Sequence, residues 1–381
     1  MKYEKKIGIL IFCFFLFLLI LGATLGKILT DQYPYPELKI FNQAFSLILS
    51  KFVDPIDNDL LLLGAEKGLL YSLDPVNIFV PKGKEDKFKE WLKKPNYDCG
   101  IRLKRSGRFV YVSKVYPLSA AEGQIQIGDI VEEVNGLKYP MYDVWELELE
   151  MRGEVGKSIK IHFTPQESDT SKEIFLQIKP YPVKDFEILQ EGELAKVKIL
   201  EMEVNSFKNL KNELKKIPKD NILVFDLRAT SSLNYDVAFK MADLFIKGPF
   251  TITYQKAKET TKVKINDEEF FSFKEIYVLQ DEETFGAAEV LSYLLEQKAK
   301  ATIVGTTSFG YFGIPKIYNL SDKSTIYLTT EIVTFEEGKN FMKKGIKPTV
   351  EVKKAYLYQE TYNKIEETLK EILREREKKA A

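Results

Sequence analysis

The sequence contains very little cysteine and histidine. Two cysteines and one histidine occur among 381 residues. Cys13 lies in a long apolar run near the N-terminus and Cys99 lies far outside it, so the two are not expected to pair within one chain. A disulfide framework or a zinc site of the usual Cys/His kind cannot be built from so few ligands. We therefore expect no metal and no cofactor.

An excess of charge of either sign is also absent. Lys and Arg total 56 and Asp and Glu total 56, which gives a formal net charge of zero. A nucleic-acid-binding protein is expected to carry a basic excess, so we expect no nucleic-acid partner. With 45% hydrophobic and 29% charged residues the composition is that of globular domains, and the length allows two or three of them.

One segment departs from this globular composition. Residues 7–26 contain no charged residue and are long enough to cross a hydrocarbon core of about 30 Å. Lys2, Lys5 and Lys6 precede the segment, which by the positive-inside rule places the N-terminus in the cytoplasm. A cleaved signal peptide is the alternative, for which residues 22–24 are a mediocre cleavage site. We favour a single-pass anchor in the cell (inner) membrane, with the bulk of the chain extracytoplasmic or periplasmic.

The chain divides into five parts by composition and periodicity. Residues 1–30 are a cytoplasmic stub and the anchor, and residues 31–95 are a proline-containing linker followed by helical periodicity. Residues 96–182 carry short strands and turn signals. Residues 183–353 alternate strands and helices, which is typical of a layered α/β domain. Residues 354–381 predict an amphipathic helix for packing or dimer stabilisation.

The middle of the chain carries a distinctive run of twenty residues. Residues 117–136 read Pro-Leu-Ser-Ala-Ala-Glu-Gly-Gln-Ile-Gln-Ile-Gly-Asp-Ile-Val-Glu-Glu-Val-Asn-Gly. The pattern predicts a short helix over 119–122 that Gly123 ends, a strand over 130–134 and a hairpin turn after it. This run resembles PDZ domains of the bacterial, circularly permuted kind. The resemblance implies a partly open β-barrel with two helices.

A PDZ domain binds a peptide end by adding it as a strand and holds the terminal carboxylate on backbone N–H groups of a loop. The resemblance places that loop at Asp98, Cys99, Gly100 and Ile101. Asp98 stands where a glycine is usual, and its charge opposes a bound carboxylate unless Arg102 offsets it. Two interpretations stay open. The domain binds a protein or peptide ligand here, or it packs within the chain or on internal segments.

A second motif lies between an apolar run at residues 276–279 and a helical run. It reads Thr284-Phe-Gly-Ala-Ala-Glu289. Many hydrolases place a nucleophile at such a turn, because N–H groups at a helix start favour developing negative charge. The motif resembles the Ser-Ala-Ser-Ala-x-Glu signature of the C-terminal processing (tail-specific) serine peptidases. Other segments extend the resemblance over about residues 38–353, namely Asp226-Leu-Arg228, Ile303-Val-Gly-Thr306, Phe309-Gly310 and Lys344-Gly-Ile-Lys-Pro-Thr-Val-Glu-Val352.

The resemblance implies a serine nucleophile that a neutral lysine activates. It puts the serine position at Gly286, the lysine position at Tyr311 and the position of a lysine-orienting glutamine at Pro315. Gly286 and Tyr311 are 25 residues apart, which equals the family's spacing of serine and lysine. All three catalytic positions are therefore lost without any shift of the alignment.

The segment that corresponds to the oxyanion loop also departs from the family. The family reads Asp-Leu-Arg-Asn-Asn-Pro-Gly-Gly, and this chain ends the same segment with Ser231, Ser232 and Leu233. Glycines there permit the backbone conformations that aim an N–H at the substrate, and Leu233 resists positive φ. Four separate losses predict an inactive member of the family. We expect a PDZ-containing binding or regulatory subunit, as a homodimer or as a heterodimer with an active relative.

The alternative is an active serine-type endopeptidase with displaced catalytic groups that processes the C-termini of envelope proteins. Its hydroxyls would come from Thr284, Ser231, Ser232 or Ser308. Lys316 is the nearest basic residue, but its odd offset from Tyr311 points it to the opposite face of an extended segment. His162 alternates with apolar residues on a predicted strand of the PDZ-like region, so a Ser-His-Asp arrangement would have to cross domains.

Overall fold

The structure is a computed structural model that describes residues 14–22, 35–266 and 269–380. Its contacts divide the chain into two compact units, residues 1–68 and residues 69–381. The second unit contains the β-sheets, in which hydrophobic clusters of buried side chains form several cores.

The first unit is helical where the structure describes it. Residues 14–22 form a helix with exposed apolar side chains, α2 spans Pro36–Lys51, and α3 (Asn58–Tyr71) begins in this unit. The remainder of the predicted anchor lies outside the described residues. None of the described helices combines the length and the apolar character that a membrane crossing requires. The anchor therefore stays a prediction.

The main sheet of the second unit has six strands in the order β19-β16-β14-β10-β9-β8. Neighbouring strands are parallel, except that β8 and β9 form an antiparallel hairpin. This arrangement confirms the α/β class expected for the core. The strands are β8 (Phe186–Glu191), β9 (Leu194–Ile199), β10 (Ile222–Asp226), β14 (Glu275–Gln280), β16 (Thr302–Gly305) and β19 (Val350–Glu351).

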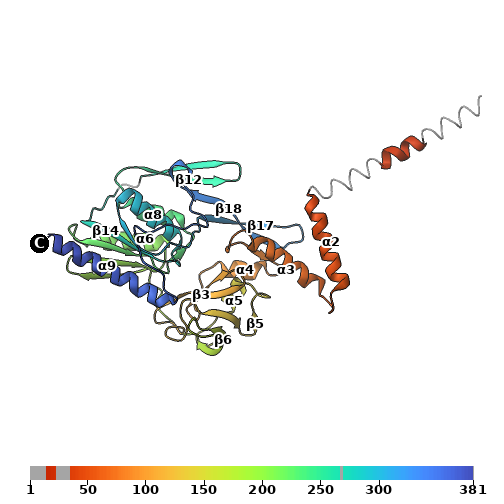
Figure 1. Cartoon of the computed structure of the whole chain (residues 1–381), viewed down its shortest axis with the longest axis horizontal. Coiled ribbons are helices and arrows are strands. Elements are labelled where there is room, and N and C mark those ends of the chain that lie inside the picture. Colours follow the sequence, from red (N-terminus) through yellow and green to blue (C-terminus); the bar gives the residue numbers. More distant parts are fainter. Residues whose placement is uncertain (1–13, 23–34, 267–268, 381) are drawn as a thin grey trace, which may run out of the picture. The chain divides into compact units, whose positions relative to one another are not determined.

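Helices cover both faces of this sheet (Figure 1). Side chains alternate along each strand, so Leu223 and Phe225 face one layer while Ile222 and Val224 face the other. The first layer contains α6 (Val204–Leu214), α7 (Tyr235–Asp243) and α8 (Ala287–Ala299), and the second contains α9 (Tyr358–Ala380).

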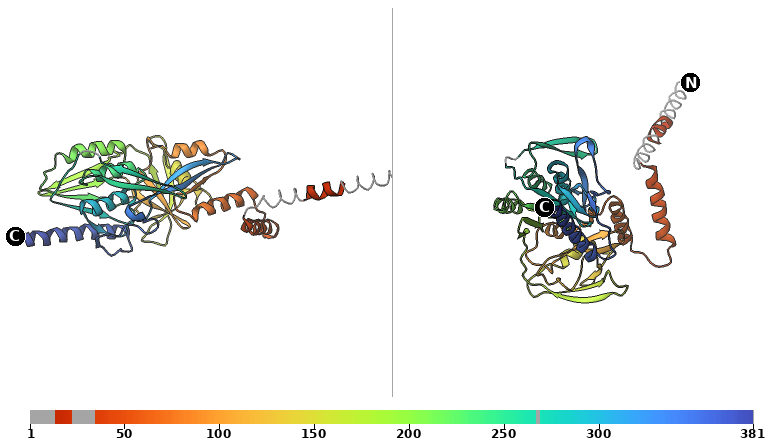
Figure 2. Two further views of the ribbon diagram at one scale, coloured as in Figure 1. Left: turned by 90° about the horizontal axis from the view of Figure 1, so that it is seen from above. Right: turned by 60° about the vertical axis from the view of Figure 1, so that its left-hand side comes forward.

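The C-terminal helix α9 packs on the core, as the sequence predicted. Ile365 and Leu369 are buried against the sheet, whereas the end of the helix carries exposed side chains and extends beyond the strands (Figure 2). Arg228 fixes the start of α9. Its guanidinium donates to both oxygens of Asp226, to Glu366 and to the carbonyl of Tyr362 at 2.6–2.8 Å. Such full pairing is required, because an arginine buried without partners is strongly destabilising.

The middle region forms a separate β-domain with its own core. Its strands run in the order β2-β3-β4-β6-β7, with β5 beside β4, and α5 (Val144–Glu150) lies against β2. The predicted strand over 130–134 is confirmed as β4. The strands are β2 (Ile101–Ser106), β3 (Phe109–Val115), β4 (Ile130–Val134), β5 (Leu137–Lys138), β6 (Ser158–Thr164) and β7 (Lys172–Gln177).

The short helix predicted over 119–122 is wrong. The segment forms turns, in which the N–H groups of Gln124 and Ile125 both donate to the carbonyl of Ala121. The N–H of Ala121 instead donates to the carbonyl of Cys99. So short a segment gains too few helical hydrogen bonds to offset the cost of starting a helix. Gly123, with φ of 73°, ends the segment as expected.

A further sheet lies beside the main one. It has the order β1-β18-β12-β13, with β17 paired to β18. The strand β1 lies in a region that was expected to be helical. It pairs antiparallel with β18, and this pairing buries the apolar side chains of all three of its residues. The elements are β1 (Ile78–Val80), α4 (Glu85–Trp91), β12 (Phe250–Lys256), β13 (Thr260–Ile265), β17 (Gly313–Asn319), β18 (Thr325–Thr334) and the short 3₁₀ turn Glu336–Gly338.

Replacing Ile365 with alanine removes a fully buried side chain from the contact between α9 and the sheet. We expect the free energy of unfolding to fall by about 2–5 kcal/mol, because apolar burial is lost and a cavity is left. Lys364→Ala, at an exposed neighbouring position, should change it by less than about 0.5 kcal/mol. Chemical unfolding of the full chain measures both values. Equal effects would contradict the described packing of α9.

Candidate functional site at the start of α8

The predicted turn from strand to helix is present. β14 leads through β15 (Phe285–Gly286) into α8, and Gly286 is the N-cap residue of that helix. The backbone of Gly286 has φ of 65° and ψ of −115°, a conformation that residues with a Cβ rarely adopt. The nucleophile position of the family therefore lies at the buried start of a helix, with a backbone that suits glycine.

The segment that corresponds to the oxyanion loop covers this position. β11 (Ser231–Ser232) pairs in parallel with β15, so that Ser232 lies opposite Gly286. A Cβ placed on Gly286 would lie 2.2 Å from the carbonyl oxygen of Ser232 and 3.6 Å from Leu233 Cδ2. No real Cβ comes that close to a carbonyl oxygen, so the space of a nucleophilic side chain is already filled by backbone.

Ser232 and Leu233, which were expected to resist positive φ, do not adopt it. Among the described residues the positive-φ position of this loop is Ala229, with φ of 55°, and not Ser232 or Leu233. The N–H of Ala229 donates to the buried carboxylate of Asp281. Burial raises the pKa of this carboxyl group to about 6. The loop is thus held in an extended form against β15.

Glu289 joins the nucleophile and lysine positions. Its Oε2 accepts from the N–H groups of Gly286 at 2.8 Å and Tyr311 at 2.9 Å. Its Oε1 accepts from Ser308 Oγ and from the N–H of Gly310, both at 2.6 Å. Burial raises the pKa of Glu289, and the four donors lower it. Burial has the larger effect, so the pKa is raised to about 7. The two positions that the alignment paired are therefore neighbours in space.

Tyr311 fills the lysine position. Its ring stacks on Phe285 with the centroids 4.9 Å apart, and its hydroxyl hydrogen-bonds to Thr329 Oγ1 at 2.8 Å. The side chain is 1% exposed, and burial raises the pKa of its hydroxyl far above the usual range. A neutral phenol held in this way cannot serve as the base that the lysine supplies in active relatives.

Pro315 lies beside this cluster. It is on β17 at a bulge next to Ile314, and it pairs with Thr329, the residue that bonds Tyr311. A proline has neither an N–H nor a polar side chain, so nothing at this position can orient a catalytic group.

Three of the four candidate substitute hydroxyls, those of Thr284, Ser308 and Ser232, make structural hydrogen bonds. Thr284 donates to the carbonyl of Leu227 and accepts from the N–H of Asp281, and it is fully buried. Ser308 donates to Glu289 and accepts from the N–H of Ile346. Ser232 accepts from the N–H of Asn234, and Ser231 is exposed on the edge of the loop.

The two candidate bases pair elsewhere. Lys316 forms an ion pair with Glu331 on β18, and this contact raises its pKa, whereas a general base needs a lowered one. His162 Nε2 lies 2.8 Å from Glu173 on the neighbouring strand β7. The structure therefore gives neither residue a role at the turn.

Sequence reasoning missed a lysine that does reach the site. Lys104 of β2 lies 4.7 Å from the ring centroid of Phe285 and 4.9 Å from that of Phe309. Its ammonium pairs with Glu283 at 2.9 Å, and Tyr111 donates to the other oxygen of the same carboxylate. These contacts dock the β-domain on the segment before Gly286. Lys104 and Glu283 are 179 residues apart in the sequence, so no local sequence pattern indicates that they meet.

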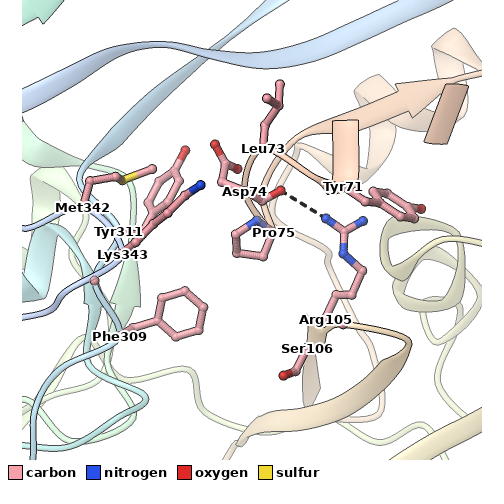
Figure 3. A pocket seen from close by; sticks show the side chains of 12 residues that line it. Tyr71, Leu73, Asp74, Pro75, Arg105, Ser106, Phe309, Tyr311, Met342 and Lys343 are labelled. Carbon is pink, nitrogen blue, oxygen red and sulfur yellow. Dashed lines mark hydrogen bonds between the residues drawn. The ribbon is translucent and has the colours of Figure 1, made fainter. Parts of the chain in front are cut away.

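A cavity of about 330 Å³ remains beside Tyr311 (Figure 3). Tyr311, Phe309, Met342 and Lys343 line one side in that view, and Asp74, Pro75 and Arg105 line the other. Arg105 donates to the carbonyl of Asp74, and its guanidinium lies 3.3 Å from the ring centroid of Tyr71. The walls are thus aromatic and carry charges of both signs.

The predicted peptide-binding loop is folded inward. Asp98 is 2% exposed and bonds Gly100, Arg102 and Tyr181. Arg102 pairs with the carboxylate and so offsets its charge. Cys99 is buried, which raises the pKa of its thiol to about 12, and Ile101 is a core residue at the start of β2.

Comparison with known proteins shows which proteins the chain resembles. Residues 193–352 match the sequence model of peptidase family S41. Over this segment the chain is similar to that family. It is 24% identical over 331 residues to the carboxy-terminal-processing protease of Bartonella bacilliformis, covering 84% of this chain and 76% of that relative.

Two further proteases show the same level of similarity. Carboxy-terminal processing protease CtpA of Bacillus subtilis is 24% identical over 315 residues, covering 81% of this chain and 67% of the relative. A probable CtpA-like serine protease of Staphylococcus aureus is 24% identical over 330 residues, covering 85% and 66%. The chain thus spans about two thirds to three quarters of these relatives. The predicted relationship to C-terminal processing peptidases is confirmed.

The fold agrees with that of a solved C-terminal processing protease. The photosystem II D1 C-terminal processing protease superposes with a TM-score of 0.64 at 18% identity, covering 84% of this chain and 93% of that one. The expected peptidase-like α/β architecture is therefore confirmed at the level of the fold.

Gly286→Ala tests the closed turn. We expect it to lower the free energy of unfolding by at least about 3 kcal/mol, because positive φ and contact with Ser232 both oppose a Cβ. Gly192→Ala is the matched control, since Gly192 has φ of 57° and open space around a Cβ. It should cost only about 1–2 kcal/mol. Thermal and chemical unfolding measure both, and equal costs would mean that Ser232 does not block the site.

Proposed function

We propose that the protein is a non-catalytic member of peptidase family S41 that acts as a binding or regulatory subunit. The observation that carries this proposal is the contact between β11 and β15. The carbonyl of Ser232 lies where the Cβ of a serine at position 286 would have to be. Covalent catalysis of this kind needs a nucleophile within reach of a base, and this turn has no space for the side chain of the nucleophile.

The base is missing for a second, independent reason. The position of the lysine carries Tyr311, which is stacked, buried and hydrogen-bonded to Thr329. The amine of Lys104 comes near the same aromatic side chains, but it is paired with Glu283. The ion pair with Glu283 and the contacts with the two rings give this amine a structural role.

The proposed binding site is the cavity beside Tyr311. Its aromatic walls suit the apolar side chains of an extended peptide, and Asp74, Arg105 and Lys343 supply polar contacts around them. The partner in this proposal is a protein or peptide, and the assembly is a homodimer or a heterodimer with an active relative. The membrane location rests on the apolar, uncharged run at residues 7–26.

A direct assay tests for proteolysis. The purified full chain should not cleave an unstructured protein such as casein, under conditions in which an active S41 peptidase does so, because no nucleophile and base are adjacent. Thr284→Ala and Lys316→Ala serve as probes for displaced catalysis and should leave the signal at background. Gel electrophoresis and mass spectrometry of the products measure cleavage. Turnover that disappears in either variant would establish the alternative, an active endopeptidase with displaced groups.

Restoration of the dyad is the complementary test. Gly286→Ser combined with Tyr311→Lys should stay at least about 10³-fold below an active relative, because Ser232 blocks the new side chain and an oxyanion donor is missing. Adding Ser232→Gly and Leu233→Gly frees the loop and should raise the rate above that of the double variant. Initial rates on the same substrate measure this. Strong activity of the double variant alone would show that the loop is not the obstacle.

A further inference from the structure

A second cavity, of about 250 Å³, lies where three parts of the chain meet. Its walls include residues of β3 in the β-domain, of β9 in the main sheet and of the start of α9. Lys114, Lys198 and Arg228 line it, and none of the described residues that line it is acidic. This lysine-lined cavity shares no lining residue with the cavity beside Tyr311.

Lys198 lines this cavity without a carboxylate to balance its charge. Its ammonium donates to the hydroxyl of Tyr362 at 3.3 Å, and within the described part of the chain it forms no ion pair. Lys196, two residues earlier on the same face of β9, pairs with both Glu366 and Asp226. The side chain of Lys198 is half-buried. An ammonium that is partly removed from water and lacks a counter-ion is stabilised by a nearby anion.

Lys114 brings a second ammonium, and this residue is 7% exposed. It donates to the carbonyl of Leu200 and to Glu201 Oε1, the latter at 3.2 Å. An ammonium has three donors, so these contacts leave one without an oxygen partner among the described residues. Burial lowers the pKa of Lys114 more than Glu201 raises it, and the nearby Lys198 lowers it as well. A bound anion would offset both the burial and the repulsion between the lysines.

Arg228 and the start of α9 complete the wall of the cavity. The guanidinium is balanced by Asp226 and Glu366, so the unbalanced positive charge comes from the two lysines. α9 begins at Tyr358, which lines the cavity, and the N-terminal end of a helix carries a partial positive charge. The acidic residue of its first turn, Glu360, is exposed and lies outside the lining. The charge that faces the cavity is therefore positive.

We propose that the lysine-lined cavity binds a phosphate group, as inorganic phosphate or as part of a small phosphomonoester, between Lys114 and Lys198. A phosphate group carries a charge of about −1.5 to −2 near neutral pH, which matches two ammonium groups better than the single charge of a carboxylate. Lysine binds phosphate through charge-assisted hydrogen bonds. The bound group ties the β-domain to the main sheet and to α9. This site does not depend on whether the chain cleaves peptides.

Calorimetry tests for the site. Sodium phosphate titrated into the full chain at constant ionic strength and neutral pH should bind saturably at one site per chain. Lys198→Gln removes the charge and should weaken the affinity at least about tenfold, the loss expected for one hydrogen bond to a charged group. Lys262→Gln, at an exposed lysine of β13, is the matched control and should bind as wild type does. Equal affinities of wild type and Lys198→Gln would overturn the proposal.

The choice of anion tests the chemistry. Sodium acetate at the same ionic strength should bind more weakly than phosphate, because it carries one charge. Equal affinities for acetate and phosphate would overturn the assignment to a phosphate group. Glycerol 3-phosphate separates the two sources of the group. Tighter binding of glycerol 3-phosphate than of inorganic phosphate would identify a phosphomonoester ligand, and the reverse order would identify inorganic phosphate.

Gln359 keeps the inference testable if Lys198→Gln does not fold. This residue lines the cavity from an exposed position on α9, where a change of side chain is tolerated. Gln359→Glu adds a negative charge beside the site and should weaken phosphate binding, whereas Gln359→Lys should strengthen it. Equal affinities of these two folded variants would overturn the proposal. A failure here would leave the argument about the turn at Gly286 unaffected, since no readout involves cleavage.

Discussion

The buried carboxylate of Glu289 is the contact on which the organisation of the site depends. It caps α8 through the N–H of Gly286 and at the same time accepts from three groups of the segment 308–311. One side chain thus fixes the end of β15, the start of α8 and the segment after β16. A buried carboxylate is stable only when its donors are all supplied, and here backbone N–H groups supply most of them.

This dependence on backbone groups explains how the fold persists without the family's catalytic side chains. The contacts of Glu289 need no serine at position 286 and no lysine at position 311, since three of its four donors are N–H groups. Where the lysine is missing, the ring of Tyr311 fills the space against Phe285. Where the serine is missing, the backbone of Ser232 comes close enough to pair with Gly286. The absence of these two side chains and the compact packing of the site are thus two aspects of one arrangement.

The elements that the sequence predicted well are those with local signals. The alternation of strands and helices from β9 to α8 and the turn at Gly286 follow from periodicity and from glycine, and the fixed spacing to Tyr311 correctly placed the two positions together. Contacts between distant segments gave no such signal. The docking of Lys104 on Glu283, the pairing of β1 with β18 and the inward turn of Asp98 depend on the folded arrangement. The prediction of a helix over residues 119–122 was wrong for a different reason. These residues favour a helix, but the segment is too short to form one.

The pairing of Arg228 has a consequence for the order in which the chain can mature during synthesis. Asp226 lies two residues before Arg228, but the carbonyl of Tyr362 and the carboxylate of Glu366 are made more than 130 residues later. Until α9 has left the ribosome, the central sheet lacks one covering layer and holds a guanidinium with half of its partners. This core is therefore completed only when α9 has been made, and a chain that stops before α9 keeps an exposed apolar face.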